Sequence, residues 1–165
     1  MNQKDLIALI EDGIERAGGR WADLGAGEGA FTHALAKLLG PEAHITAVDK
    51  DAHAVRAIDG RIETRVADFT KPLDLHDLDG IVMANSLHFV RNKQPVLESV
   101  RRMLSPGGRL IVVDRVWDGP RKSLGALSLH LCAMGRAGQR RRLQEHSALE
   151  DGPEPLARQH VLSRQ

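Results

Sequence analysis

The sequence contains one cysteine, Cys132, among its 165 residues. A single thiol cannot form an internal disulfide, and it leaves no second thiolate to share a zinc ion. Its neighbours Leu129, Leu131 and Met134 are apolar, so we expect Cys132 in the protein core. The histidines also lack a ligand pattern, because no His-Glu-x-x-His or comparable spacing occurs. We therefore predict no metal site.

Long apolar runs and a strong charge of one sign are missing as well. No stretch approaches the roughly 18 apolar residues of a membrane-spanning helix, and the first residues lack the basic and apolar regions of a leader. The formal net charge is +1, which gives no general attraction to nucleic acid or to a membrane surface. We expect a cytoplasmic protein without membrane association.

The charge is unevenly placed along the chain. Residues 1–114 carry 14 Lys and Arg against 17 Asp and Glu, whereas residues 115–165 carry 9 against 5. We therefore expect a core over residues 1–115 and an atypical basic segment over residues 116–165. That segment is predicted to hold one helix, Ser123 to Met134, followed by loop or disorder. Its basic run Arg140 to Arg142 is interpreted as a solvated face rather than an RNA contact.

Short apolar runs alternate with helical patterns through the core. The chain opens with an amphipathic helical pattern that Gly18 and Gly19 end. Five runs have the composition of buried strands: Arg20 to Leu24, His44 to Val48, Ile62 to Val66, Gly80 to Ala84 and Arg109 to Val113. Further helices are predicted at Ala30 to Leu39, Asp51 to Ile58 and Lys93 to Leu104. This alternation predicts an α/β fold, a doubly wound and mainly parallel sheet with helices on both faces.

A glycine-rich turn, Asp-Leu-Gly-Ala-Gly-Glu-Gly-Ala-Phe, follows the first strand and begins at Asp23. In an open α/β sheet, ligands bind beyond the carboxyl ends of the strands, where this turn lies. Gly25 can form a tight turn, Gly27 allows a ligand to approach the backbone, and Gly29 allows close helix packing. The turn also satisfies the G-x-G-x-x-G/A spacing of dinucleotide sites, with Ala30 last.

Charge distinguishes the two ligands that this turn could bind. A pyrophosphate would sit against the helix N-terminus, where Asp23 and Glu28 would repel it. The same carboxylates favour a sulfonium ligand that also bears an ammonium group. The turn therefore favours S-adenosylmethionine over a dinucleotide.

Acidic residues also follow the second and third strands. Asp49 can accept hydrogen bonds from both hydroxyls of a ribose, and Lys50 is placed in the same site. The alternative is that Asp49 caps the helix that starts near Asp51. Asp68 can accept from an adenine amino group while Phe69 borders the base, the alternative being a plain loop aspartate.

The fourth strand ends in polar residues. The segment from Asp79 to Val90 is a buried run that reaches Asn85 and Ser86 and continues to His88. Such groups lie near the ligand crevice of an open α/β sheet.

In this order, the motifs resemble those of the class I S-adenosylmethionine-dependent methyltransferases over residues 20–115. The turn and fifth strand that begin at Leu104-Ser105-Pro106-Gly107-Gly108 fit the same pattern. The resemblance implies a Rossmann-like methyltransferase fold with S-adenosylmethionine as cofactor. The implied cofactor-binding residues are Asp23, Gly25, Ala26, Gly27, Asp49, Lys50, Asp68, Phe69 and Asn85.

The resemblance also implies methyl transfer to an O, N, C or S atom by in-line displacement, which depends chiefly on alignment. His88 is the candidate base, the alternative being a histidine that packs against the cofactor or beside Phe89. Asn85 to His88 lacks the Asn-Pro-Pro-Tyr signature of methylases acting on adenine or glutamine, so we expect a small-molecule acceptor rather than nucleic acid. Two other functions stay open: a non-catalytic cofactor-binding or partner-binding domain, and an NAD-dependent oxidoreductase.

One part of the family pattern is not found. The sheet of this family is normally completed by a C-terminal strand hairpin, and after Asp114 no alternating strand pattern is evident, so the hairpin is expected to be missing or atypical. The strand Arg109 to Val113 would then be an open edge. We therefore expect self-association through that edge unless the tail covers it.

Overall fold

The computed structural model describes residues 2–117 and 122–130. Its helices are α1 (Gln3–Ile10), α2 (Ala30–Leu39), α3 (Ala52–Val55) and α4 (Gln94–Met103), with short 3-10 helices η1 (Glu11–Gly13) and η2 (Leu87–Phe89). Its strands are β1 (Gly19–Leu24), β2 (Ala43–Asp49), β3 (Glu63–Val66), β4 (Leu78–Ala84), β5 (Leu104–Trp117) and β6 (Lys122–His130). Of the predicted helices, Ala30 to Leu39 is confirmed with its bounds, whereas α3 is shorter than predicted.

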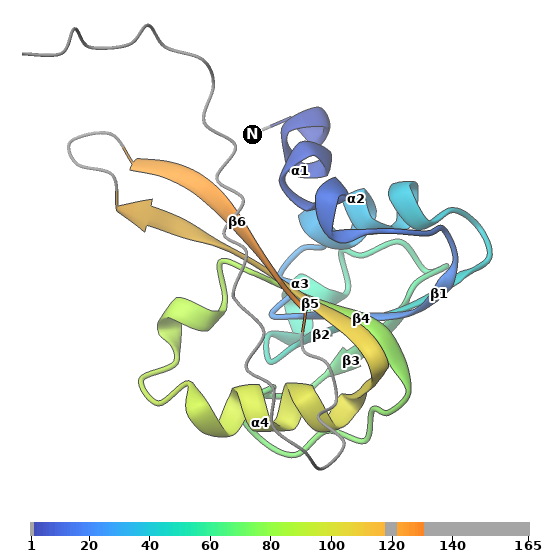
Figure 1. Cartoon of the computed structure of the whole chain (residues 1–165). Helices are drawn as coiled ribbons and strands as arrows, with labels where there is room; N and C mark the ends of the chain where they lie inside the picture. Colours follow the sequence, from blue (N-terminus) through green and yellow to red (C-terminus); the bar gives the residue numbers. More distant parts are fainter. Residues whose placement is uncertain (1, 118–121, 131–165) are drawn as a thin grey trace, which may run out of the picture.

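The six strands form one sheet in the order β3-β2-β1-β4-β5-β6 (Figure 1). The pairs from β3 to β5 are all parallel, and β6 runs antiparallel to β5. The strand order reverses between β1 and β4, and this is the point at which an open α/β sheet forms its ligand crevice. The predicted doubly wound, mainly parallel sheet is confirmed.

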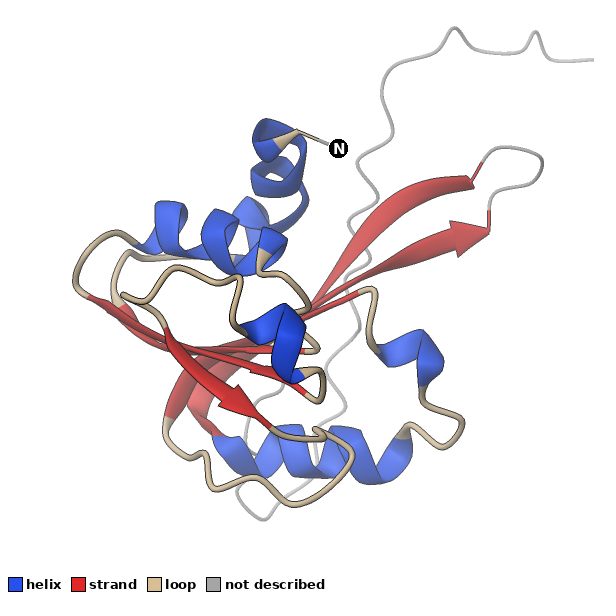
Figure 2. Cartoon of the chain, turned by 180° about the vertical axis from the view of Figure 1, so that it is seen from behind, coloured by secondary structure: helices blue, strands red, loops and turns tan. Residues whose placement is uncertain are grey.

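Helices cover both faces of the sheet, with α1 and α2 on one side and α4 on the other (Figures 1 and 2). Successive residues of β4 pack against the helices on both faces of the sheet, because side chains along a strand point alternately to opposite sides. Ile81 and Met83 pack into the core layer that contains Val96 and Val100 of α4. The residue between them, Val82, packs into the layer that contains α1 and α2.

The helix predicted at Ser123 to Met134 is wrong over residues 123–130. These residues belong to β6, which pairs with β5 in continuous register from Arg109 opposite His130 to Trp117 opposite Lys122. Backbone pairing along the apolar β5 outweighs the local helical spacing of the leucines, since long-range contacts override weak local preference. Residues 131–134, with Cys132, and the basic run at 140–142 lie outside the described residues.

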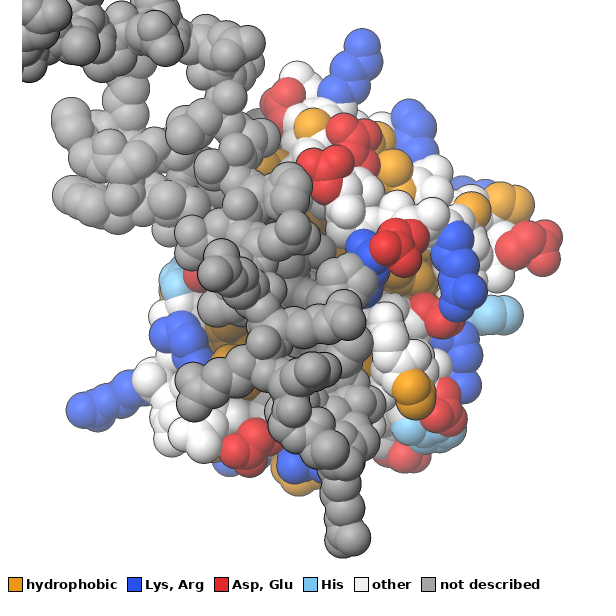
Figure 3. Space-filling model, viewed as in Figure 1, with side chains coloured by type: hydrophobic (Ala, Val, Ile, Leu, Met, Phe, Trp, Pro, Cys, Tyr) orange, Lys and Arg blue, Asp and Glu red, His pale blue; other side chains and the backbone are white. Residues whose placement is uncertain are grey.

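The predicted open edge at Arg109 to Val113 is also wrong, because every residue of that run has a partner on β6. The predicted self-association through this edge therefore loses its structural basis. The β5–β6 ribbon continues past the end of β4 and projects beyond the rest of the sheet (Figures 1 and 2). Over the visible described surface, acidic and basic side chains are mixed rather than separated (Figure 3).

Candidate functional site

A cavity of 540 Å³ opens at the carboxyl ends of the parallel strands. Its walls come from the segments that follow β1, β2, β3 and β4, so it lies where the strand order reverses. The residues that line it are Gly25, Asp49, Lys50, Asp68, Phe69, Thr70, Asn85, Ser86, Phe89, Val90 and Arg91. Six of the residues predicted to bind a cofactor, namely Gly25, Asp49, Lys50, Asp68, Phe69 and Asn85, are thus brought together around one space.

The glycine loop is fixed to β2 by its backbone. The amides of Gly25 and Ala26 both donate to the carbonyl of Val48, at 2.8 and 3.1 Å. Gly25 has φ +85°, and a Cβ placed on it would lie 2.4 Å from Cβ of Ser86. The Ser86 hydroxyl in turn donates to the carbonyl of Leu24 at 2.8 Å. Glycine at position 25 is therefore required by the close approach of the segment after β4.

Gly27 occupies a different position in the same loop. Its φ is +54°, and a Cβ placed on it would have no described atom within 4 Å. Its amide donates to Oδ2 of Asp49 at 2.8 Å. The Cβ direction of Gly27 is therefore open and its amide is held by Asp49, although Gly27 does not line the cavity.

Asp49, at the end of β2, has both carboxylate oxygens engaged with backbone amides. Oδ2 accepts from Gly27, and Oδ1 accepts from Asp51 at 3.0 Å. The cap of α3 is Asp51, whose side chain accepts from the amides of His53 and Ala54, so the interpretation of Asp49 as that cap is wrong. Each carboxylate oxygen can accept more than one hydrogen bond, so Asp49 is held in place and can still accept from a ligand hydroxyl.

Asp23, near the end of β1, does not line the cavity and is buried, with 1% of its surface exposed. Its Oδ2 accepts from the Thr32 hydroxyl at 2.7 Å. Its Oδ1 has no hydrogen-bond partner among the described residues. Burial raises the pKa of this carboxyl to about 6, against an ordinary value of 3.8. Such an unpaired buried oxygen is costly unless a bound ligand or water reaches it.

The segment after β3 supplies Asp68, Phe69 and Thr70. Oδ1 of Asp68 accepts from the Thr70 hydroxyl at 2.7 Å and from the Thr70 amide at 2.9 Å. These hydrogen bonds hold the pKa of Asp68 below its ordinary value. The Phe69 ring borders the glycine loop, because its Cε1 would lie 3.3 Å from a Cβ on Gly25.

Asn85 follows β4 in the left-handed region, with φ +51°. Asparagine tolerates this conformation better than most residues. Its amide donates to the carbonyl of Val113 at 2.7 Å, which ties the start of the next segment to β5.

His88 does not line the cavity, although Ser86 and Phe89 on either side of it do. Its Nδ1 lies 2.9 Å from Oδ1 of Asp114, and the two side chains are 37% and 31% exposed. Its ring also packs on Phe89 at a centroid distance of 4.0 Å. The packing role and the acid–base role considered for His88 are therefore both compatible with its position.

Sequence reasoning missed several residues of this site: Thr70, Phe89, Val90, Arg91 and Asp114. Asp114 carried a usable signal, because it ends the apolar run Leu110 to Val113 in the same way that Asp49 ends its strand. Phe89 is identified by the structure alone, in which 81% of its surface is exposed. Thr70, Val90 and Arg91 lie a few residues after strand ends, and no sequence motif marks them.

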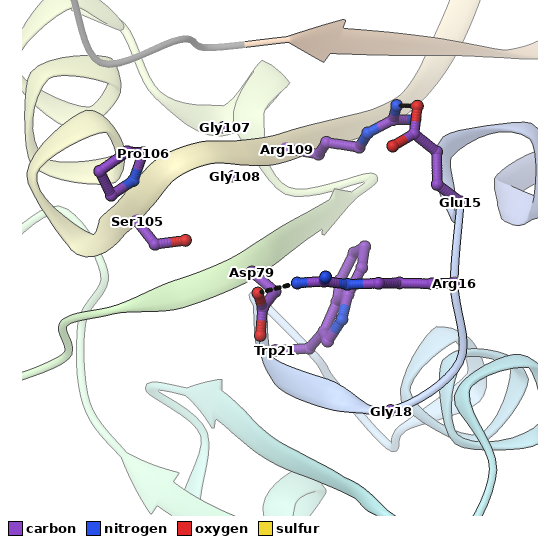
Figure 4. Close-up of a pocket in the computed structure, with 10 residues that line it drawn as sticks. All are labelled: Glu15, Arg16, Gly18, Trp21, Asp79, Ser105, Pro106, Gly107, Gly108 and Arg109. Atoms are coloured by element: carbon purple, nitrogen blue, oxygen red, sulfur yellow. Dashed lines mark hydrogen bonds and ion pairs between the residues drawn. The ribbon is translucent and has the colours of Figure 1, made fainter.

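A second cavity, of 230 Å³, lies at the opposite end of the sheet near the starts of β1 and β4 (Figure 4). Its charged groups pair with one another. Arg16 contacts Asp79 at 3.0 Å, and Arg109 pairs with Glu15. Asp79 also accepts from the amide of Arg20 at 2.9 Å. These pairs hold the segment before β1 against the sheet, so we assign this cavity a structural role.

Within the described residues, no cluster of three or more His, Cys, Asp or Glu is arranged to hold a metal ion. A search of the same part of the chain finds no helix with the length and hydropathy of a membrane span.

The family model described as "Methyltransferase domain" matches residues 22–110. Among curated proteins, the ubiquinone/menaquinone biosynthesis C-methyltransferase UbiE of Pseudomonas savastanoi pv. phaseolicola is 30% identical over 109 residues, which cover 60% of this chain and 43% of that protein. The protein of the same name from Pseudomonas putida is 31% identical over the same coverage. The chain thus spans less than half the length of these relatives.

Solved structures of methyltransferases share the fold. A SAM-dependent methyltransferase from Aquifex aeolicus superposes with a TM-score of 0.63 at 22% identity, covering 72% of this chain and 68% of that one. Coclaurine N-methyltransferase bound to N-methylheliamine and SAH gives a TM-score of 0.61 at 22% identity, covering 67% and 35%. At this identity the likeness establishes the fold alone.

Proposed function

The chain belongs to the methyltransferase domain family, and on that premise we propose that it transfers a methyl group from S-adenosylmethionine to a small-molecule acceptor. The observation that carries the proposal is the cavity at the carboxyl ends of the strands, which is lined by Gly25 of the glycine loop and by Asp49, a carboxylate held by the amide of Gly27.

The residues of this cavity suit the parts of S-adenosylmethionine. Asp49 can accept from the ribose hydroxyls, and Asp68 with Phe69 can border the adenine. The open space beside Gly27 leaves room for the chain that carries the sulfonium. Oδ1 of Asp23 is a buried acceptor without a partner in the described residues, which suits the ammonium group or a water bound to it.

S-adenosylmethionine supplies a methyl group on positively charged sulfur, and the chain's own task is to align the acceptor and remove water. Alignment of this kind can lower the activation barrier by about 7 kcal/mol or more in favourable cases. Phe89 and Val90 provide an apolar border on the side of the cavity next to His88. We assign His88 the role of proton acceptor for the incoming nucleophile.

The relatives and the exposed Phe89 ring suggest the chemical class of the methyl acceptor. The relatives named above are C-methyltransferases of ubiquinone and menaquinone biosynthesis. The exposed Phe89 ring fits an aromatic acceptor, since rings pack favourably on one another. We therefore propose hydroquinones as the first acceptors to test.

Two titrations and one transfer assay test the proposed function. Calorimetric titration is expected to give binding of S-adenosylhomocysteine and none of NAD. Tight NAD binding would instead support an oxidoreductase. Transfer of a labelled methyl group from S-adenosylmethionine to 1,4-naphthohydroquinone, or to components of a metabolite extract, is expected in the same preparation. Cofactor binding without transfer to any acceptor would support a non-catalytic binding domain.

A further inference from the structure

His88 and Asp114 come from different elements but meet beside the cavity. His88 lies in η2, and Asp114 lies on β5, yet Nδ1 and Oδ1 are 2.9 Å apart. The hydrogen bond from the Asn85 amide to the Val113 carbonyl ties the segment that leads into η2 to β5, three residues before His88 and one residue before Asp114. The backbone therefore brings the two segments together, and the two half-buried side chains meet where they adjoin.

The 2.9 Å contact favours a hydrogen on Nδ1 of His88. A carboxylate offers only lone pairs, so two lone pairs would repel at this distance unless Nδ1 carries hydrogen. A neutral imidazole with its proton on Nδ1 has its lone pair on Nε2. No described residue forms a hydrogen bond with that nitrogen.

We propose that Asp114 is a positioning residue that keeps the proton of His88 on Nδ1 and so presents Nε2 as the proton acceptor for the methyl acceptor. This inference rests on the proposed function, but its structural part can be tested without turnover. A carboxylate behind an imidazole both orients the ring and stabilises the imidazolium that forms when it takes a proton.

The proposed step begins with a hydroquinone as the methyl acceptor. Nε2 takes the hydroxyl proton, and a ring carbon uses the released electron density to form a bond to the methyl carbon. The bond from that methyl carbon to sulfur breaks, and its electron pair stays on sulfur. The hydrogen on the attacked ring carbon then moves to the oxygen, which restores the aromatic ring. The net products are a methylated hydroquinone, a thioether and one proton held by His88.

The chain contains a second His–Asp pair that serves as a matched control. Nδ1 of His76 lies 2.8 Å from Oδ2 of Asp77, with side-chain exposures of 66% and 75%. These neighbours lie in the segment before β4 and do not line the cavity. The same substitution at Asp77 thus removes another contact between a histidine and a carboxylate, a hydrogen bond between neighbours in the chain, away from the site.

The test is nitrogen NMR of the full chain labelled with 15N-histidine at alkaline pH, where the neutral rings report their tautomer. The His88 signals are identified by their loss in His88→Asn. We expect a protonated Nδ1 in the unaltered protein and a shift toward the Nε2-protonated tautomer in Asp114→Asn. Asp114→Glu is expected to restore the original tautomer at least in part, and Asp77→Asn is expected to leave His88 unchanged.

The kinetic arm uses labelled S-adenosylmethionine with 1,4-naphthohydroquinone. Asp114→Asn and His88→Asn are each expected to lower kcat by about tenfold or more. Affinity for S-adenosylhomocysteine should stay within twofold, whereas Asp77→Asn should change neither quantity. Circular dichroism and thermal unfolding establish that each variant is folded.

An unchanged His88 tautomer in folded Asp114→Asn overturns the proposal, whether or not transfer is observed. A shifted tautomer with an unchanged kcat also overturns it, because the pair would then be structural. Failure of the proposed function gives a different result. The unaltered protein then transfers no label to any acceptor, while the tautomer of His88 still shifts in Asp114→Asn.

Discussion

The amide of Gly27 donates a hydrogen bond of 2.8 Å to Oδ2 of Asp49, so the carboxylate after β2 holds the glycine loop after β1. The two residues are 22 positions apart in the chain. They meet because β1 and β2 are adjacent parallel strands whose carboxyl ends lie together. This bond couples the shape of the loop to the residue assigned to the ribose.

Asp49→Ala is expected to weaken binding of S-adenosylhomocysteine by about 1–3 kcal/mol, because ribose hydroxyls lose a charged acceptor and the loop loses its tie. Calorimetric titration measures the change. Asp59→Ala is the control, because Asp59 pairs with Arg61 at the surface and does not line the cavity. Equal affinity of folded Asp49→Ala and the unaltered protein would exclude the ribose role.

Gly27→Val is expected to abolish measurable S-adenosylhomocysteine binding, because its side chain would project into open space, which the proposed function assigns to the chain that carries the sulfonium. A positive φ strains any substituted residue, so the effect of strain has to be separated from that of obstruction. Gly40 provides the match, with φ +78° and no described atom within 4 Å of a Cβ. Gly40→Val tests strain without obstruction, because φ +78° with ψ −175° is a conformation that essentially only glycine adopts, and it should still bind the ligand. Tight residual binding by Gly27→Val would mean that the ligand lies elsewhere.

Gly25→Ala is expected to destabilise the protein by about 1–3 kcal/mol, because its methyl group would overlap with Ser86 in a packed region. Urea unfolding measures the loss. The double variant Gly25→Ala with Ser86→Gly removes the overlapping Cβ and should recover part of the stability relative to the sum of the two single changes. Gly40→Ala has the positive φ without the overlap, so it controls for backbone strain. Additive losses in the double variant would contradict the packing explanation.

The sequence predicted most of the fold because the features that define it are local. The glycines at 29 and 40 bound α2 directly, and the apolar runs of β1, β2 and β4 lie within two residues of the observed strands. The strand β6 could not be predicted in this way, since it depends on pairing with β5 and its leucines also satisfy a helical spacing. Local pattern and long-range pairing conflicted there, and pairing prevailed.

Some residues of the candidate site could likewise be predicted from local patterns, and others depend on tertiary contacts. Asp49, Asp68 and Asn85 follow strand ends, so the rule that ligands bind at those ends is enough to find them. The contact between His88 and Asp114 depends on how η2 is tied to β5, which no spacing in the sequence encodes. The burial of Asp23 is likewise a tertiary property, and it carries a consequence for pH dependence.

Asp23→Asn is expected to stabilise the protein at pH 8 and to have little effect at pH 4. The folded-state pKa of Asp23 is raised to about 6 from 3.8, so the folded protein binds the proton more tightly than the unfolded chain does. Between these two values the free energy of unfolding therefore falls as pH rises, and above about pH 6 the full cost is present. That cost is on the order of 3 kcal/mol, which the neutral asparagine avoids.

Urea unfolding at pH 4 and pH 8 measures this difference. Calorimetry at pH 8 should show weaker S-adenosylhomocysteine binding by the same variant, because the buried negative charge that we assign to the ammonium group is lost. Asp59→Asn is a control of opposite sign, since hydrogen bonds from Arg61 lower the pKa of Asp59 and its ionised form is the stabilising one. That variant should give no gain at pH 8. If Asp23→Asn and the unaltered protein keep the same stability difference at both pH values, Asp23 does not carry the buried charge, and the ammonium contact loses its support.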